Sequence, residues 1–419
     1  MRPLRTALLS FLVALPAFSA ARLTYTINGT AVPVSWKSFP ISYSIDRRVA
    51  DAAPNGAAQI DRAIAEWTGV ADAQVSFDPR GVADGLKAGK DGQNSITMAD
   101  DLFANQHYIA MTTNWYDDNG RVIEADIQID PMAMKNGYNL PQLIEHESGH
   151  LLGLDHSAVL TSVMYPYVGN GGTSSLDSDD RIVISTMYPR TAPMAGATLQ
   201  GRVSGDDGGI FAAQVVALNE QGEPVATALT EKDGTYSLQN MPSGNYRIYA
   251  EPLDGPVNVS NLSGAWRLAK VKSFPTQFAD GGAPLRVESG KIYGNINVNG
   301  AGAVQLNPKW IGAGAPYSAN VSMGAMPIAV RAGQLVTIAI GGDGFVSGMT
   351  TFDIASPGFQ RVSEFAWSGN YVSATYRLNL DAPAGSVVVL AKSGSESAAL
   401  TGALRVEPRG RARSVIARK

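Results

Sequence analysis

The residues best suited to chemistry form one short cluster: His146, Glu147, His150, Gly153 and His156. If a helix covers its first part, His146 and His150 lie on one face, one turn apart, so that both imidazoles can reach one cation. Gly153 can adopt the left-handed conformation that ends a helix and reverses the chain, which would bring His156 round as a third ligand. Three protein ligands leave one tetrahedral position for water, the arrangement of a catalytic zinc ion.

Glu147 directly follows the first ligand, where it can act as a general base. In this chemistry zinc lowers the pKa of a bound water, a carboxylate takes its proton, and a polarised carbonyl is attacked. The cluster therefore predicts a hydrolase with one catalytic Zn²⁺. Two other interpretations are an ordinary helix end with surface histidines, and a zinc site kept for stability after catalysis was lost. The presence of Glu147 argues against the second.

The cluster resembles the zinc motif of the metzincin metalloendopeptidases and, among them, the matrixins. Metzincins carry a methionine turn beneath the metal, and residues 162–166 (SVMYP) are similar to it, so Met164 would support the histidines. Residues 176–189 resemble the last matrixin helix, with Asp177 or Ser178 as its N-cap. The resemblance covers residues 30–190. It implies an α+β catalytic domain with a mixed twisted sheet and an active-site helix.

The segments before the motif follow matrixin order. Alternating residues predict short strands at residues 39–45, 75–77, 95–99, 107–113 and 124–130, the first strand starting near Ile41. Ile60, Ile64 and Trp67 are spaced for one face of a helix. Asn139 can cap the active-site helix, with Pro141 in its first turn. The resemblance implies that residues 107–113 form the edge strand that pairs with an extended substrate.

The chain also departs from the matrixin pattern. Matrixins generally hold a structural zinc with further histidines, but only His107 stands outside the cluster, so we expect no structural zinc. Residues 117–120 (DDNG) offer oxygen ligands that suit Ca²⁺, but Asn-Gly is also a strong hairpin signal, and we favour the turn. Calcium binding has no other support. The chain has no cysteine, which excludes latency through a propeptide cysteine bound to zinc.

Length and composition indicate several domains in an exported protein. The 419 residues are 45% hydrophobic and 17% charged, with 44 glycines and 23 prolines, typical of β-rich extracellular modules. The net charge of −4 gives no case for nucleic acid. Residues 1–21 have the layout of a signal peptide, the alternative being a membrane anchor. We therefore predict a secreted protein with no membrane span after processing and no room for a sizeable propeptide. The absence of cysteine favours a bacterium over an animal.

Short strands separated by turns follow a linker near residues 191–196 and predict two all-β sandwich domains. Residues 196–300 resemble the carboxypeptidase regulatory-like domain through Gly201-Arg202-Val203, Asp233-Gly234-Thr235-Tyr236 and Pro242-Ser243-Gly244. The resemblance implies that this domain stabilises or spaces the protein rather than binds a ligand. Residues 301–408 resemble an immunoglobulin-like domain, with residues 341–345 as a loop. Its aromatic residues are expected in the core, the alternative being a carbohydrate-binding surface: Trp310, Tyr317, Trp367 and Tyr371. Residues 409–419 form a basic tail.

The first functional hypothesis is a secreted zinc endopeptidase that acts on extracellular proteins or peptides. The family architecture implies that Tyr165 and Tyr167 shape the pocket for the side chain after the scissile bond. The second hypothesis is a surface-binding or adhesive protein that contacts cell-envelope or matrix surfaces through its β domains, the zinc domain being accessory. A third is a zinc amidase that acts on non-peptide amides.

Overall fold

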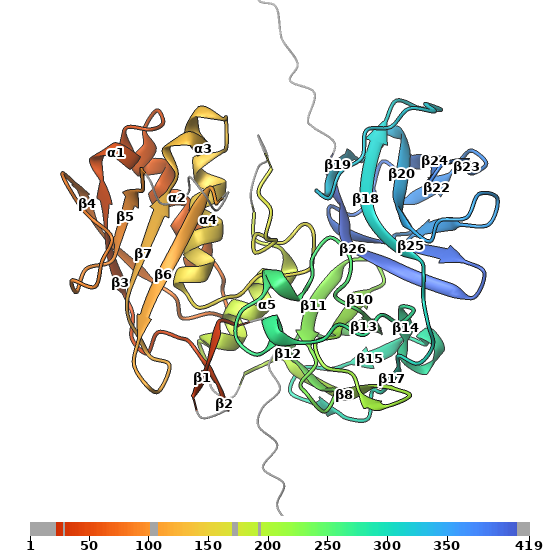
Figure 1. Ribbon diagram of the computed structural model, residues 1–419, viewed down its shortest axis with the longest axis horizontal. Helices are drawn as coiled ribbons and strands as arrows, with labels where there is room; N and C mark the ends of the chain where they lie inside the picture. The colour runs from red at the N-terminus through yellow and green to blue at the C-terminus, as the bar shows by residue number, and fades with distance from the viewer. Residues whose placement is uncertain (1–21, 28–29, 101–107, 170–174, 192–193, 409–419) are drawn as a thin grey trace, which may run out of the picture.

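The structure is a computed structural model that describes residues 22–27, 30–100, 108–169, 175–191 and 194–408. Along the chain we distinguish an N-terminal part (residues 22–191), a middle part (194–300) and a C-terminal part (301–408) (Figure 1). Helices and strands alternate in the first part, whereas the other two are built almost wholly of strands. The predicted signal peptide, the basic tail and His107 lie outside the described residues.

The N-terminal part contains a five-stranded sheet in the order β4-β3-β5-β7-β6. Its strands are β3 (Ile41–Asp46), β4 (Phe77–Ala83), β5 (Ser95–Met98), β6 (Ala110–Tyr116) and β7 (Val122–Ile129). Neighbouring strands are parallel from β4 to β7, whereas β6 pairs antiparallel with β7 and ends the order. The sheet is therefore mixed, as predicted.

The helices of this part carry its core and position the zinc motif. They are α1 (Arg47–Ala50), α2 (Gly56–Thr68), α3 (Pro131–Lys135), α4 (Leu140–Leu151) and α5 (Ser178–Met187). Ile60, Ile64 and Trp67 of α2 are buried as their spacing predicts. The Trp67 indole donates a hydrogen bond of 3.0 Å to the carbonyl of Glu145, which joins α2 to α4.

Helix caps set where two of these helices begin. The side chain of Asn139 accepts a hydrogen bond from Gln142 at the start of α4, with a proline in the first turn, as predicted. Asp177 caps α5, and its backbone N–H donates to the side chain of Asp180 at 2.8 Å. Two acidic residues in the first turn of α5 also suit the positive end of the helix dipole.

Three strand predictions near this sheet need correction. A hairpin of β1 (Thr24–Ile27) and β2 (Thr30–Pro33) precedes the strand expected to be first. The strand predicted at 75–77 begins at Phe77 and extends to Ala83, and the edge strand predicted at 107–113 is described from Ala110 to Tyr116. Hydrogen bonding to the neighbouring strands decides where each strand begins and ends, and the alternation of residues along one strand does not show this pairing.

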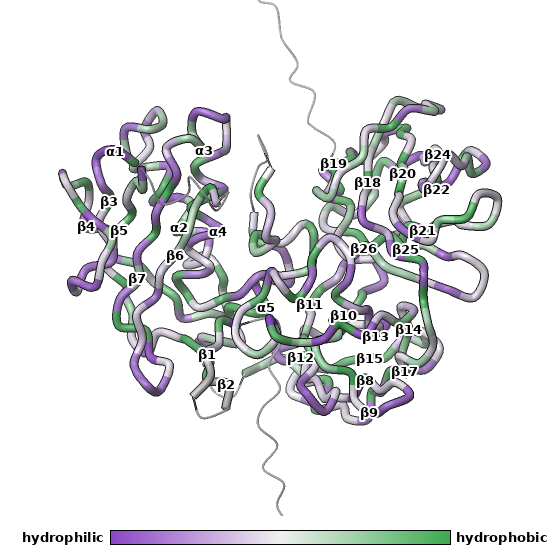
Figure 2. Tube along the Cα trace, viewed as in Figure 1, coloured by the Kyte–Doolittle hydropathy of each residue, from purple (hydrophilic) through white to green (hydrophobic). Residues whose placement is uncertain are grey.

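Residues 117–120 form the hairpin turn that joins β6 to β7, which confirms that interpretation. The N–H of Asp117 donates to Arg121 at 3.0 Å, and Gly120 has a φ of 74°. Figure 2 shows this hydrophilic turn at the periphery of the molecule. Its backbone hydrogen bonds account for the geometry of the segment.

The middle part has two sheets around a shared core. One contains β10 (Gln214–Asn219), β11 (Pro224–Leu229), β13 (Gly244–Glu251), β14 (Gln277–Phe278) and β15 (Leu285–Val287). The other contains β8 (Ala197–Gly205), β9 (Gly208–Gly209), β12 (Thr235–Met241), β16 (Ile292–Tyr293) and β17 (Val298–Asn299). Leu199 and Leu238 of one sheet share a buried cluster with Val215 and Ile248 of the other. Short 3₁₀ turns lie between strands: η1 (Val259–Asn261), η2 (Trp266–Leu268) and η3 (Ala279–Gly282).

The C-terminal part also has two sheets around one buried cluster. The first contains β18 (Asn307–Gly314), β20 (Leu335–Asp343), β22 (Phe359–Arg361), β23 (Ala366–Ser368) and β24 (Tyr371–Leu378). The second contains β19 (Ile328–Arg331), β21 (Thr351–Ile354), β25 (Gly385–Ser393) and β26 (Glu396–Glu407).

Two details of the C-terminal part contradict the predictions. Gly341 to Asp343, predicted as a loop, continue β20 because they pair with β18. The core prediction for the aromatic residues is wrong for Tyr317, which is 65% exposed and has a φ of 60°, and neither Trp310 nor Tyr371 belongs to the buried cluster of this part. Trp367 only packs at the margin of the core. Within the described part of the chain, no helix is long and apolar enough to cross a membrane.

Candidate metal centre

The three histidines of the motif converge at the C-terminal end of α4. His146 and His150 lie one turn apart on the helix, and Gly153 has a φ of 93° where the chain reverses. A side-chain Cβ at position 153 would lie 2.4 Å from the carbonyl oxygen of Val34. Glycine is therefore required both by the positive φ and by the lack of space for a side chain. After this reversal His156 faces the helix, and the donor atoms of the three imidazoles lie within 4.8 Å of one another.

Hydrogen bonds at the far side of each ring show which nitrogen faces the centre. Nδ1 of His146 donates to the carbonyl of Val163 at 2.7 Å, and Nδ1 of His150 donates to that of Leu154 at 2.8 Å. Nδ1 of His156 lies 2.5 Å from the carbonyl of Asn261. Because a carbonyl oxygen only accepts, each Nδ1 carries the proton and each Nε2 presents its lone pair.

This donor set fits a zinc ion. Nε2 of His150 and Nε2 of His156 are 3.2 Å apart, and with both Nδ1 atoms protonated the two lone pairs repel each other. Two nitrogens that each bind zinc tetrahedrally at ~2.0–2.1 Å would be about 3.3 Å apart. Burial lowers the pKa of His146 to about 3 and that of His150 well below its usual range, so both are neutral at pH 7. Neutral imidazole is the form that binds metal.

Glu147 is buried beside these rings and is 5% exposed. Oγ1 of Thr112, on the edge strand β6, lies 2.7 Å from its Oε2 and 3.0 Å from its carbonyl oxygen. Burial raises the pKa of the Glu147 carboxyl to about 7, and the Thr112 hydroxyl opposes the rise. A carboxyl that titrates near neutrality is suited to accept and return a proton at pH 7.

Met164 lies against the helix that carries two of the histidines and is 1% exposed. A Cβ at Gly149 would lie 2.2 Å from its sulfur, so the turn approaches α4 as closely as glycine permits. Asp180 of α5 holds the same turn, since its carboxylate accepts from Ser162 Oγ at 2.6 Å and from the N–H of Val163 at 2.9 Å. The structure thus brings the turn residue predicted at position 164 to the back of the ligand helix.

The loop between the third histidine and this turn also contacts the C-terminal part. The N–H of Leu160 donates to the carbonyl of Thr401 at 2.9 Å, and Arg405 donates to the carbonyl of Thr161 at 2.5 Å. Gly402 of β26 leaves no room for a side chain here, because a Cβ would lie 2.7 Å from a methyl group of Val159. Strand β26 is therefore packed directly on the loop behind the candidate centre.

Tyr165 does not lie where the resemblance implied. It is 2% exposed, packs in the buried cluster of the C-terminal part, and donates to the carbonyl of Ala325 at 2.5 Å. A residue buried in this way does not line an open pocket. Tyr167, whose ring packs edge-on against Tyr165, is 45% exposed and stays available to a ligand.

Sequence reasoning assigned no contact to several residues that surround the candidate centre. Asp155 accepts from the N–H of His156 at 2.8 Å, and Thr112 contacts Glu147. From the middle part, Asn261 contacts His156 and Ser263 contacts Asp155. Thr112 was detectable in principle because it falls on the predicted edge strand. Neither Asn261 nor Ser263 carries a local signal, because only the packing of two distant segments places them here.

On helix α4 and the turn after it, three convergent imidazoles beside a buried carboxyl form a group that could hold a metal ion. The family model of the matrixins, which are metalloproteases, matches residues 35–189. The chain therefore carries a matrixin domain, and the resemblance inferred from the motif is confirmed.

Similar proteins match over short stretches. Karilysin of Tannerella forsythia is 42% identical over 53 residues, which cover 13% of this chain and 11% of karilysin. Hatching enzyme of Paracentrotus lividus is 46% identical over 55 residues, 13% of this chain and 9% of the enzyme. The chain thus spans about a tenth of each relative's length. Among solved structures, domains 4–9 of the surface layer protein SbsC align over 51% of this chain and 30% of that one, with 14% identity and a TM-score of 0.17. That score is too low to support a shared fold.

Proposed function

We propose that this protein is a secreted zinc-dependent endopeptidase that hydrolyses peptide bonds of extracellular proteins. The observation that carries the proposal is the convergence of three Nε2 lone pairs beside the buried carboxyl of Glu147. His146, His150 and His156 would hold one zinc ion, and Met164 would support them from below. The proposed domains are the matrixin domain at 30–190 and the β domains at 196–300 and 301–408.

Each side chain of the centre has a proposed part in the reaction. When bound, zinc would supply an acidified water and polarise the scissile carbonyl. Glu147 accepts the proton of the attacking water and returns it to the amine that leaves. Thr112 holds the Glu147 carboxylate in one orientation while its proton is exchanged. Neutral His146 and His150 place no competing proton on the ligand nitrogens.

Strand β6 is proposed to bind the substrate backbone. It ends the order of the sheet, and its residues Thr112 and Asn114 contact the active-site helix, since Asn114 donates to the carbonyl of His150 at 3.0 Å. An extended peptide can add to such an edge through main-chain hydrogen bonds. It would then lie alongside Glu147 and the histidines, which places a carbonyl group near the base.

Two further parts of the proposal come from the sequence. The layout of residues 1–21 and the absence of cysteine support export from a bacterial cell. The β domains are proposed to stabilise or space the protease, as their resemblances imply, and the contacts of β26 with the loop after His156 support a stabilising role.

The experiment is hydrolysis of casein and of a quenched-fluorescent peptide library, with and without a zinc chelator, beside the Glu147→Ala variant. We expect chelator-sensitive cleavage by the wild type. We expect the variant to retain zinc but to lose activity by ~10²–10⁴-fold, the usual share of a general base. A folded, zinc-loaded wild type that cleaves no peptide would refute the endopeptidase and leave the β domains as the carriers of function.

A further inference from the structure

The third histidine differs from the other two in what orients it. His146 and His150 find carbonyl acceptors for Nδ1 within the matrixin domain, at Val163 and Leu154. The acceptor for His156 is the carbonyl of Asn261, 105 residues further along and in the middle part. Asn261 ends the turn η1, in the segment of residues 252–270 that connects strand β13 to the last strands of that part.

A second contact from the same segment holds the residue before the ligand. Oδ2 of Asp155 accepts hydrogen bonds from the N–H of Ser263 at 2.7 Å and from its Oγ at 2.6 Å. Oδ1 of the same carboxylate accepts from the N–H of His156. The segment therefore reaches His156 by two routes, directly at the ring and through Asp155 at the backbone.

The turn that presents the Asn261 carbonyl is itself well defined. The side chain of Asn258 accepts from the N–H and the hydroxyl of Ser260, and the side chain of Asn261 accepts from the N–H of Asn258 at 3.0 Å. These reciprocal hydrogen bonds form a capping box between the N-cap Asn258 and the last residue of η1, Asn261. The direction of the carbonyl thus depends on two asparagine side chains.

Apolar packing anchors the rest of the segment. Leu253, Leu262 and Trp266 are buried in one cluster, against which Ala158 of the matrixin domain also packs. At Gly264 a Cβ would lie 1.9 Å from Oγ1 of Thr24, so strand β1 packs closely against the segment. The segment thus contacts the N-terminal part at Ala158 and at Thr24, and these contacts hold the turn beside the ligand.

We propose that Asn261 is a positioning residue of the zinc site, and that the matrixin domain of this protein forms its complete site only with the segment of residues 252–270. A carbonyl acceptor fixes the tautomer and rotation of a ligating histidine and makes its other nitrogen more basic. Removing such a partner typically weakens metal binding by about 10–100-fold. The inference rests on the zinc binding proposed above but not on peptide hydrolysis.

The test uses variants of the full chain that act on the turn. Asn258→Ala/Asn261→Ala removes both caps, whereas Asn258→Asp/Asn261→Asp keeps both acceptor oxygens. Asn245→Ala/Asn297→Ala is the matched control, because these two asparagines bond to Glu220 and Arg202 on the exposed surface of the same part. Ser263→Ala is a milder variant that removes the hydroxyl contact to Asp155 and the weaker one from the N–H of Thr24 at 3.4 Å.

Zinc affinity is measured by competition with a chromophoric chelator, and the visible absorption of the Co²⁺-substituted protein reports on ligand geometry. Thermal unfolding of the metal-free proteins checks that each variant folds. We expect the double alanine variant to bind zinc at least tenfold more weakly and to shift the Co²⁺ bands. The double aspartate variant and the control are expected to bind at least as tightly as the wild type, and Ser263→Ala to be intermediate.

Two results would overturn the inference in distinguishable ways. A folded double alanine variant with wild-type zinc affinity and Co²⁺ spectrum would show that the Asn261 carbonyl positions nothing. A wild type that binds no zinc would refute the proposed function and, with it, the inference. A wild type that binds zinc but cleaves no peptide would refute only the endopeptidase, and the comparison of affinities would still decide the role of Asn261.

Discussion

The hydroxyl of Thr112 lies 2.7 Å from the carboxylate of Glu147, so that the edge strand of the sheet is joined to the proposed catalytic base. The two residues are 35 positions apart and belong to β6 and α4. Strand β6, which is proposed to bind the substrate, thus also orients Glu147, the proposed base. The position of the substrate and the orientation of the base are therefore coupled.

Replacing Thr112 with valine should lower kcat/KM by about 10- to 100-fold, because a hydrogen bond to a charged group is worth ~1.5–3 kcal/mol. The hydroxyl lowers the pKa of Glu147, so its loss should also shift the acid limb of the pH profile to higher pH. Peptide cleavage from pH 5 to 9 measures both effects. Thr113→Val is the control, since alternation places its side chain on the other face of the strand. Equal losses in the two variants would contradict the prediction.

Replacing Gly149 with alanine should destabilise the N-terminal part by about 1–3 kcal/mol, the usual effect of overpacking a core. The added methyl group would lie 2.2 Å from the sulfur of Met164 and 3.0 Å from the ring of Trp67, which is fully buried. Urea unfolding followed by tryptophan fluorescence measures the change. Gly294→Ala is the matched control, because no atom lies within 4 Å of its added methyl group. A loss of stability no larger than that of the control would show that the methionine turn can move away freely.

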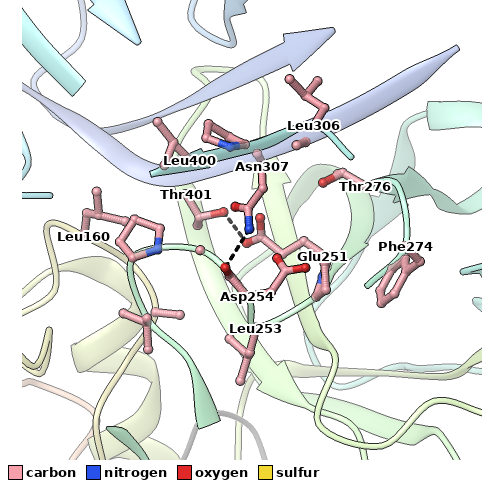
Figure 3. A pocket seen from close by; sticks show the side chains of 18 residues that line it. Leu160, Glu251, Leu253, Asp254, Phe274, Thr276, Leu306, Asn307, Leu400 and Thr401 are labelled. Carbon is pink, nitrogen blue, oxygen red and sulfur yellow. Dashed lines mark hydrogen bonds between the residues drawn. The ribbon is translucent and has the colours of Figure 1, made fainter. Parts of the chain in front are cut away.

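Glu251 should make the protein less stable as the pH rises. It lies in the pocket of Figure 3 between the middle and C-terminal parts, and its carboxyl accepts from Gln214 at 2.8 Å and from Thr401 at 2.5 Å. Burial, with a smaller contribution from the nearby Asp254 carboxylate, raises its pKa from 4.5 to about 8, although the hydrogen bonds from Thr401 and Gln214 oppose the rise. Between pH 4.5 and about pH 8 the folded state binds more protons at Glu251 than the unfolded state does. The free energy of unfolding therefore falls as the pH rises through this range.

The variant Glu251→Gln tests this because glutamine keeps the acceptor oxygen but has no proton to lose. From pH 6 to pH 8 its unfolding free energy should fall less than that of the wild type, by up to about 2.7 kcal/mol at ~1.36 kcal/mol per pH unit. Urea titrations at the two pH values measure the difference. Parallel pH dependences of wild type and variant would mean that Glu251 is already ionised in the folded protein.

Metal removal should lower stability as well as activity. Three imidazole nitrogens converge in the folded state, so zinc should bind that state in preference to the unfolded chain. At a free zinc concentration of a thousand times Kd, the unfolding free energy should rise by about 4 kcal/mol. Calorimetry with and without a chelator measures the shift in Tm. His156→Ala should remove most of it, and an equal shift in that variant would point to zinc bound elsewhere.

Local sequence determined much of the matrixin domain. The spacing of His146 and His150 requires one helix face, and only a residue such as Gly153 turns the chain tightly enough to bring the next histidine back. Asn139 and Asp177 begin their helices because a side-chain oxygen satisfies backbone N–H groups within three residues. These features depend on neighbours in the chain, and a pattern of residue types is enough to express them.

Tertiary structure alone decided what lies around the three histidines. The Asn261 carbonyl acts on His156 only after two segments 105 residues apart have packed together, and a backbone carbonyl is present at every position of any sequence. Tyr165 was expected in a pocket but is buried, because strands of the C-terminal part cover it. Residue type carries no record of such distant contacts. The sequence therefore determined which side chains form the candidate centre, and the packing of the β parts decided which groups hold them in place.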